Sequence, residues 1–183
     1  MLRMRSAPAA ARGLAPVDSL DAQFHGPPSK SIAQRVIVAA GLAQGTTNIA
    51  GLGKPHSNGA DVEAALLTAA ARGAFLGFFP RGEFAVGGVP PSQAGRPSPR
   101  LHLGESGTLA RLSLACAALA TAEGTITELI PSGSLARRSS PALVACLRAA
   151  GVPLDTGGWP RSVPARTPPN RLVLEQPGSS QSQ

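Results

Sequence analysis

Residues 29–35 read Ser29-Lys30-Ser31-Ile32-Ala33-Gln34-Arg35 and open the first helical pattern of the chain. A helix N-terminus presents unpaired backbone N–H groups and a partial positive charge, so it favours a bound anion. Pro28 fixes the approach to this helix, a serine can cap it, and Lys30 adds a point charge. Arg35 follows Ser31 by one helical turn, on the same face. The stretch predicts a phosphate site; the alternative is an ordinary capped helix whose charges face solvent.

Apolar periodicity and helix-end signals predict four helices, at residues 31–42, 61–72, 108–122 and 141–150. The expected inward positions are Ile32, Val36 and Ala39 or Ala40 in the first helix, Val62, Leu66 and Ala69 or Ala70 in the second, and Leu109, Leu112, Cys116 and Leu119 in the third. Short β-prone runs lie between or after the helices, at residues 46–49, 84–86, 101–103, 125–130 and 172–174. Helices and strands therefore alternate, as in an α/β (α+β) fold.

One order of features occurs twice: an arginine, an apolar helix, Gly-Thr, a strand, a second helix and a terminal glycine. The first copy contains Arg35, Gly45-Thr46 and Gly73, and the second contains Arg111, Gly124-Thr125 and Gly151. We expect repeated βαβ-type units at about 20–90 and 98–160, followed by the start of a third. Together these would form one domain over residues 18–183, after a flexible N-terminal tail at 1–17.

The chain is strongly basic: 15 Arg and 2 Lys against 10 acidic residues give 183 residues a net charge of +7. Such a charge steers anions toward the surface, although the arginine codon preference of a GC-rich genome explains the excess equally well. The arginines are scattered singly, without interleaved stacking aromatics, a zinc-ligand spacing or a helix-turn-helix pattern. A nucleic-acid partner is therefore not expected.

Both cysteines, Cys116 and Cys146, lie in apolar helical patterns, where a free thiol behaves as a small hydrophobe. They indicate neither a disulfide framework nor a metal site, and a reducing compartment fits them best. No apolar run approaches the roughly 18–20 residues of a membrane span. The first 17 residues carry three arginines and no acid, which weakly resembles an organellar transit peptide. We expect a cytoplasmic protein without a membrane partner; plastid import is the minor alternative.

Three further segments have the composition of ligand-binding turns. Gly104-Glu105-Ser106-Gly107-Thr108 precedes the third helix and Arg111, and Ser134-Leu135-Ala136-Arg137-Arg138-Ser139 precedes the fourth. Ser179-Ser180-Gln181 follows a strand-like run and a Pro-Gly turn. Taken singly, these segments are equally well a capped helix start, a solvated loop and a polar tail. Their order together with residues 28–35 is more specific.

In that order, the four segments resemble the N-terminal part of the EPSP synthases, formally 3-phosphoshikimate 1-carboxyvinyltransferases. That family has Pro-Gly-Ser-Lys-Ser-x-x-x-Arg, an Asn-Ala-Gly-Thr or Glu-Ser-Gly turn, a Ser-Leu-x-x-Arg-Pro loop and a Ser-Ser-Gln triplet. The resemblance runs from about Leu20 to the last residue. It implies one lobe of an inside-out α/β barrel of the enolpyruvyl transferase type, here incomplete. It also implies transfer of the enolpyruvyl group of phosphoenolpyruvate to the 5-hydroxyl of shikimate 3-phosphate, with release of phosphate, on the way to chorismate and the aromatic amino acids.

The resemblance also assigns roles to residues. Lys30 would be catalytic and contact both substrates. Shikimate 3-phosphate would be bound by Lys30, Ser31, Arg35, Ser179, Ser180 and Gln181. Phosphoenolpyruvate would be bound by Lys30, Gly107 and Arg138, with Glu105 and Arg111 as possible further contacts. Neither a metal nor another cofactor is required.

The sequence departs from the family pattern at Glu105, where many members have Asn, and at Ser139 and Pro28, which replace Pro and Gly. Family members are over twice as long, and their acid and base carboxylates come from a second lobe. We therefore expect weak binding of shikimate 3-phosphate and no turnover by this chain alone. One alternative is the UDP-N-acetylglucosamine enolpyruvyl transferase, which has Lys-Asn at the first turn. The other is a non-catalytic, anion-binding remnant of such an enzyme.

Overall fold

The computed structural model describes residues 29–52, 58–79, 83–90, 99–119, 123–155, 158–159 and 162–167. Four expected features lie outside these residues: the tail at 1–17, Pro28, the strand at 172–174 and the triplet Ser179-Ser180-Gln181. The described elements are α1 (Lys30–Leu42), β1 (Gly45–Ile49), α2 (Ala60–Ala71), β2 (Phe75–Phe79), β3 (Glu83–Gly88), β4 (Arg100–Gly104), α3 (Gly107–Leu119), β5 (Ile126–Pro131), the 3-10 turn η2 (Gly133–Arg137), α4 (Pro141–Ala149) and β6 (Ser162–Pro164).

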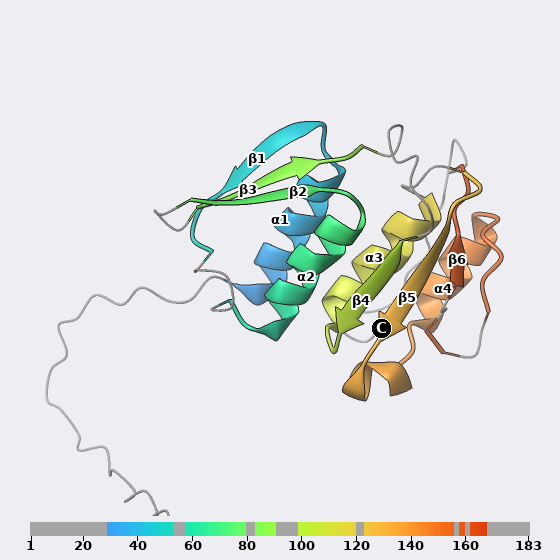
Figure 1. Ribbon diagram of the computed structural model, residues 1–183. Helices are drawn as coiled ribbons and strands as arrows, with labels where there is room; N and C mark the ends of the chain where they lie inside the picture. The colour runs from blue at the N-terminus through green and yellow to red at the C-terminus, as the bar shows by residue number, and fades with distance from the viewer. Residues whose placement is uncertain are drawn as a thin grey trace, which may run out of the picture.

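The strands form two small sheets (Figure 1). The first has the order β1-β3-β2 and is antiparallel throughout, with Thr47 opposite Val86 and Leu76 opposite the same valine. The second has the order β4-β5-β6, in which β4 and β5 are parallel and β6 is antiparallel to β5. The predicted α/β class is confirmed. The described residues form no closed barrel, as expected of an incomplete one.

A single hydrophobic core runs through both halves of the chain. Helices α1 and α2 pack together under the first sheet, α2 also packs on β4, and α1 contacts α3 (Figure 1). The core is aliphatic, and Ile37, Leu101 and Leu114 are completely buried in it. The two sheets are therefore held to one another by helices, which places the N-terminal ends of those helices in fixed relative positions.

The predicted helix positions are confirmed, but two predicted buried faces are correct only at Ala40 and Leu109. In α1, Ile32 is 62% exposed and Val36 is 37% exposed, and the buried positions are Ala33, Gln34, Ile37, Ala40 and Gly41. In α3, Leu109 is buried, whereas Leu112, Cys116 and Leu119 are only partly covered; Ala110, Ser113, Leu114, Ala117 and Ala118 are buried instead. Both helices are apolar on several sides and are covered by more than one neighbour, so periodicity alone does not select the face. In α2 the predicted face is correct.

Two strands were not predicted. Strand β2 contains Gly77 in its centre and lies at the edge of the first sheet, where β3 supplies its hydrogen-bond partners. Strand β6 has only three residues and exists by pairing with β5. Both depend on a partner distant in sequence more than on their own β propensity. The first four predicted β-prone runs are confirmed as β1, β3, β4 and β5. Their bounds agree within about two residues at each end, which is the usual spread of such boundaries.

Glycines in the left-handed region stand at equivalent points of the two predicted copies. Gly45 and Gly124, with φ of 91° and 85°, lead from a helix into β1 and β5. Gly73 and Gly151, with φ of 101° and 88°, follow α2 and α4. These φ values favour glycine because it lacks a Cβ. The two repeat units and their boundaries stay a prediction.

The structure also bears on the cysteines and on membrane-spanning helices. Both cysteines are free thiols. Among the described residues, no helix combines the length and the apolar character needed to cross a membrane.

Candidate anion-binding site

Three helices begin at the same end of the molecule, the lower end in Figure 1. The side chain of Gln34 connects them: it is completely buried, and its Nε2 donates to the backbone O of Asp61 at 2.9 Å and to Oγ of Ser106 at 2.6 Å. Asp61 lies in the first turn of α2, and Ser106 immediately precedes α3. One amide on α1 therefore joins the starts of α2 and α3. Three partial positive charges point to one region of the surface.

Ser106 caps α3. Its Oγ accepts from the backbone N–H of Leu109 at 3.2 Å, and its carbonyl O accepts from Ala110 N at 3.0 Å. Ser29 precedes α1 without the predicted side-chain cap, and Ser140 likewise precedes α4 without a side-chain hydrogen bond to the helix. At α1 and α4, backbone N–H groups of the first turn are thus not capped by these hydroxyls.

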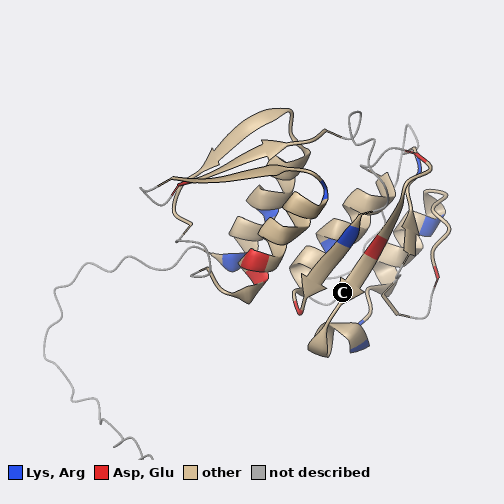
Figure 2. Ribbon diagram, in the orientation of Figure 1, with Lys and Arg blue, Asp and Glu red and all other residues tan. Residues whose placement is uncertain are grey.

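Lys30, Ser31 and Arg35 lie together in the first two turns of α1. Nζ of Lys30 is 2.7 Å from Oδ2 of Asp61, and the Lys30 side chain is 62% exposed. Nη1 of Arg35 donates to the backbone O of Ser31 at 2.9 Å, so the guanidinium lies along its own helix. Figure 2 shows basic and acidic residues meeting at the starts of α1 and α2. Lys30 is the exposed member of its pair, whereas the Asp61 side chain is only 20% exposed, so Lys30 is the partner that can turn toward a ligand.

A second group of cationic side chains surrounds Gly107, the first residue of α3. A Cβ placed on Gly107 would lie 3.8 Å from Nη1 of Arg111 and 3.9 Å from Nη1 of Arg138. The two guanidinium groups therefore converge on a backbone that is bare of a side chain. They border a cavity of about 370 Å³, whose lining includes Gly107, Thr108, Arg111, Arg138, Ser139 and Trp159. A small oxyanion fits the charge of this cavity and the donors available at its wall.

Glu105 lies two residues before Gly107, and its carboxylate is held by Ser134. Its Oε2 accepts from Ser134 N at 3.0 Å and from Ser134 Oγ at 2.8 Å. The two hydrogen bonds from Ser134, backbone first, lower the pKa of Glu105 below its ordinary value, and the charges of Arg138 and Arg137 add to the effect. The carboxylate therefore stays ionised at neutral pH. Nη2 of Arg138 donates to the same Ser134 Oγ at 3.1 Å.

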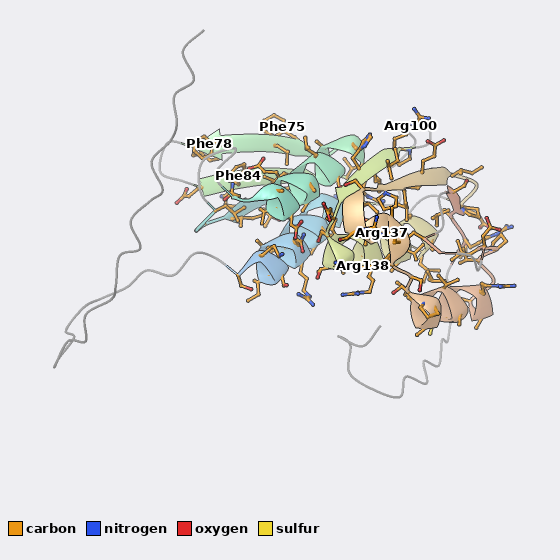
Figure 3. The ribbon with its side chains drawn as sticks, turned by 90° about the horizontal axis from the view of Figure 1, so that it is seen from below. Phe75, Phe78, Phe84, Arg100, Arg137 and Arg138 are labelled. Atoms are coloured by element: carbon orange, nitrogen blue, oxygen red, sulfur yellow. The ribbon has the colours of Figure 1, made fainter. Side chains whose placement is uncertain are left out.

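The structure brings the predicted residues together in two clusters. Lys30, Ser31 and Arg35 form the first, Glu105, Gly107, Arg111 and Arg138 form the second, and the Gln34–Ser106 hydrogen bond joins the elements that carry them. Figure 3, seen from below, shows Arg137 and Arg138 beside one another at this end of the molecule. Ser179, Ser180 and Gln181 lie outside the described residues. No group of three potential metal ligands occurs in the described part of the chain.

Sequence reasoning missed Gln34 and Trp159. No role was assigned to Gln34 from the sequence, although it is a polar residue on the buried face of α1, beside Ala33, Ile37 and Ala40. Because Ile32 and Val36 were the predicted inward positions, the need of Gln34 for buried partners becomes visible only from the packing of α1. Trp159 is the only tryptophan of the chain and borders the cavity at 9% exposure. Its loop position offered no signal in the sequence.

Replacing Gln34 by leucine is expected to destabilise the protein by about 1–3 kcal/mol, because the carbonyl of Asp61 loses a buried donor and the starts of α2 and α3 lose their link. Urea unfolding followed by circular dichroism measures the change. Arg35→Leu, at the adjacent exposed position, should stay within about 0.5 kcal/mol of the wild type. Equal stabilities of the two variants would contradict the role given to Gln34.

Comparison with solved structures identifies the architecture. Two structures of EPSP synthase from Acinetobacter baumannii match with TM-scores of 0.64 and 0.62, at 25% and 26% sequence identity. Each match covers 78% of this chain, and 31% or 32% of the solved chain. The chain has the fold of part of an EPSP synthase. The resemblance predicted from the sequence is thereby confirmed.

The extent of the match is as informative as its quality. The chain spans about a third of the length of these EPSP synthase structures, which is consistent with an N-terminal part. No protein-family model and no curated protein matches the sequence. The structural similarity supports the enolpyruvyl transferase family, and the open arrangement of two small sheets agrees with an incomplete EPSP synthase-like lobe.

Proposed function

We propose that this chain supplies the N-terminal part of an active site that transfers the enolpyruvyl group of phosphoenolpyruvate to the 5-hydroxyl of shikimate 3-phosphate. The observation that carries the proposal is the junction of three helix starts at Gln34, beside a cavity bordered by Arg111 and Arg138. Both substrates are anions, and a site for them requires several converging positive groups. The similarity to EPSP synthases supports the same reaction.

In this proposal the two clusters serve the two substrates. The α1 cluster of Lys30, Ser31 and Arg35 would bind shikimate 3-phosphate, together with Ser179, Ser180 and Gln181. The cavity at Gly107 would bind phosphoenolpyruvate through Arg138 and Arg111, with Lys30 reaching both ligands. Cations placed beforehand around the phosphate that leaves stabilise its growing negative charge, without any metal or other cofactor.

The organisation of the chain belongs to the same proposal. We take residues 18–183 as one partial domain with two repeat units after a tail at 1–17, and we place the protein in the cytoplasm, where the free thiols of Cys116 and Cys146 fit. We propose that the acid and base carboxylates come from a second lobe, since this chain spans about a third of the length of the EPSP synthase structures that it matches.

 The whole enzyme's activity is therefore proposed for the complete site and not for this segment alone.

The purified chain is expected to release no phosphate from phosphoenolpyruvate and shikimate 3-phosphate, because the groups that move protons are proposed to lie on a second lobe. A coupled phosphate assay measures this, with EPSP synthase from Acinetobacter baumannii as the positive control. Isothermal titration of the same preparation should show weak binding of each anion. Clear turnover by the chain alone would overturn the expectation, and absence of binding for both anions would overturn the proposed site.

A non-catalytic anion-binding module is the second candidate, because the described site supplies converging arginines and a cavity for an anion. The sequence of the gene beyond Gln183 discriminates between the two. A reading frame that continues into segments rich in Asp, Glu and Arg favours the enzyme, whereas a stop codon favours the module. A UDP-N-acetylglucosamine enolpyruvyl transferase is disfavoured because Ser31 stands where that enzyme has Asn.

A further inference from the structure

We propose that Glu105 is a positioning residue, which orients the guanidinium of Arg138 toward the cavity through the hydroxyl of Ser134. The inference rests on the proposed function, since it concerns the cavity assigned to phosphoenolpyruvate. It gives a role to the position at which this chain carries an acid and many family members carry Asn.

The hydrogen bonds run in one direction. The Ser134 hydroxyl donates its proton to Glu105 Oε2 at 2.8 Å, so its oxygen presents only lone pairs to the other side. Arg138 Nη2 donates to that oxygen at 3.1 Å, while Nη1 of the same guanidinium is the atom near Gly107. One edge of the guanidinium is thus held by Ser134, and the other is left to face the cavity.

The backbone around Ser134 is shaped to bring it onto the carboxylate. Gly133 has a φ of 50°, and a Cβ at this position would overlap the carboxyl group of Glu105. Ser132 N donates to the carbonyl O of Gly104 at 2.9 Å, which ties the start of η2 to the end of β4. Arg138 N donates to Leu135 O at 3.0 Å, which closes the turn before the side chain that it carries. The backbone of these two loops therefore fixes where Ser134 meets the carboxylate of Glu105.

An acid beside an anion site has an opposite effect as well, because its charge repels the ligand. Two features reduce that repulsion. Oε2 of Glu105 is occupied by both donors of Ser134, and Arg137 and Arg138 lie close enough to affect its ionisation. Orientation of Arg138 should therefore outweigh repulsion, and the balance can be measured.

The test compares sulfate binding by the full chain and its variants, because sulfate keeps both charges over the working pH range. Glu105→Ala should weaken sulfate binding about five- to tenfold, since Arg138 loses its orientation. Glu105→Gln should stay within about twofold, because an amide oxygen still accepts from Ser134. Ser134→Ala should match Glu105→Ala, and the double variant should be no worse than either single one, as for residues that act as a unit. Glu123→Ala removes one exposed acid elsewhere and serves as the control for net charge.

Unchanged or tighter sulfate binding by Glu105→Ala would overturn the proposal, because repulsion would then dominate. Absence of binding by the wild type would instead overturn the proposed anion site at Gly107. In that event the positioning role is still decided without ligand, by the nitrogen-15 relaxation of the Arg138 guanidinium. Greater mobility of this group in Glu105→Ala than in the wild type and in Glu105→Gln supports the role, and equal mobility in all three refutes it.

Discussion

The Gly88→Ala variant is expected to lose about 3 kcal/mol of stability or more, a large part of the total of a domain of this size. A Cβ at Gly88 would overlap the carbonyl oxygens of Ala40 and Ala43 and lie 3.1 Å from Ala43 N. These are backbone atoms at the end of α1, which have no rotamer by which to move aside. Relief requires β3 to separate from α1, and the hydrogen bond from Val89 N to Gly41 O, at 3.0 Å, resists this.

Urea unfolding followed by circular dichroism measures the loss, and Gly41→Ala is the matched control. A Cβ at Gly41 would lie 3.4 Å from Ala69 Cβ, which is an ordinary contact, and alanine is favoured over glycine inside a helix by about 0.5–1 kcal/mol. The control should therefore be neutral or slightly stabilised. If both variants unfold at the same urea concentration, close packing of β3 on α1 is not what requires glycine at position 88.

Arg138→Ala is expected to weaken the binding of phosphoenolpyruvate about 10- to 100-fold. A charge-assisted hydrogen bond contributes about 1.5–3 kcal/mol, and every 1.4 kcal/mol is a factor of ten in affinity. The Arg138 guanidinium borders the cavity and converges with Arg111 on Gly107, so its removal leaves one of the two cations at this place. Isothermal titration of the full chain with phosphoenolpyruvate measures the effect.

Arg137→Ala provides the control for this experiment. It removes the same charge from the adjacent residue, which is exposed in η2 and does not line the cavity. We expect a loss of no more than about threefold, the size of a screened, long-range effect. Equal losses in the two variants would show that the anion responds to the overall charge of this end of the molecule and not to a specific contact.

The sequence predicted helices well where residues at their own ends define where they start and stop. The starts and stops of α2 and α4 follow from Asp61 near one N-terminus, Pro141 at the start of the other, and a glycine after each. The order of the four binding segments was sufficient to predict the EPSP synthase resemblance before any fold was known. These signals depend on a residue and its near neighbours, so they are readable along a single chain.

Other features needed the assembled structure. The buried faces of α1 and α3 were predicted incorrectly, because several of their faces are apolar and the neighbours decide which is covered. Strand β2 requires β3 for its hydrogen bonds, and Trp159 reaches the cavity from a loop far from Gly107 in the sequence. In each case the deciding partner lies many residues away.

The sequence by itself determined which groups are available to hold an anion: Lys30, Arg35, Arg111 and Arg138, with glycine and serine at the helix starts. Only the tertiary structure decided how they are arranged. It buries the amide of Gln34 between the starts of α2 and α3, and it connects Glu105 to Arg138 through Ser134. The physical reason is that hydrogen bonds and charges act over a few ångströms in space, and packing of the helices brings residues 72 positions apart, such as Gln34 and Ser106, within that range.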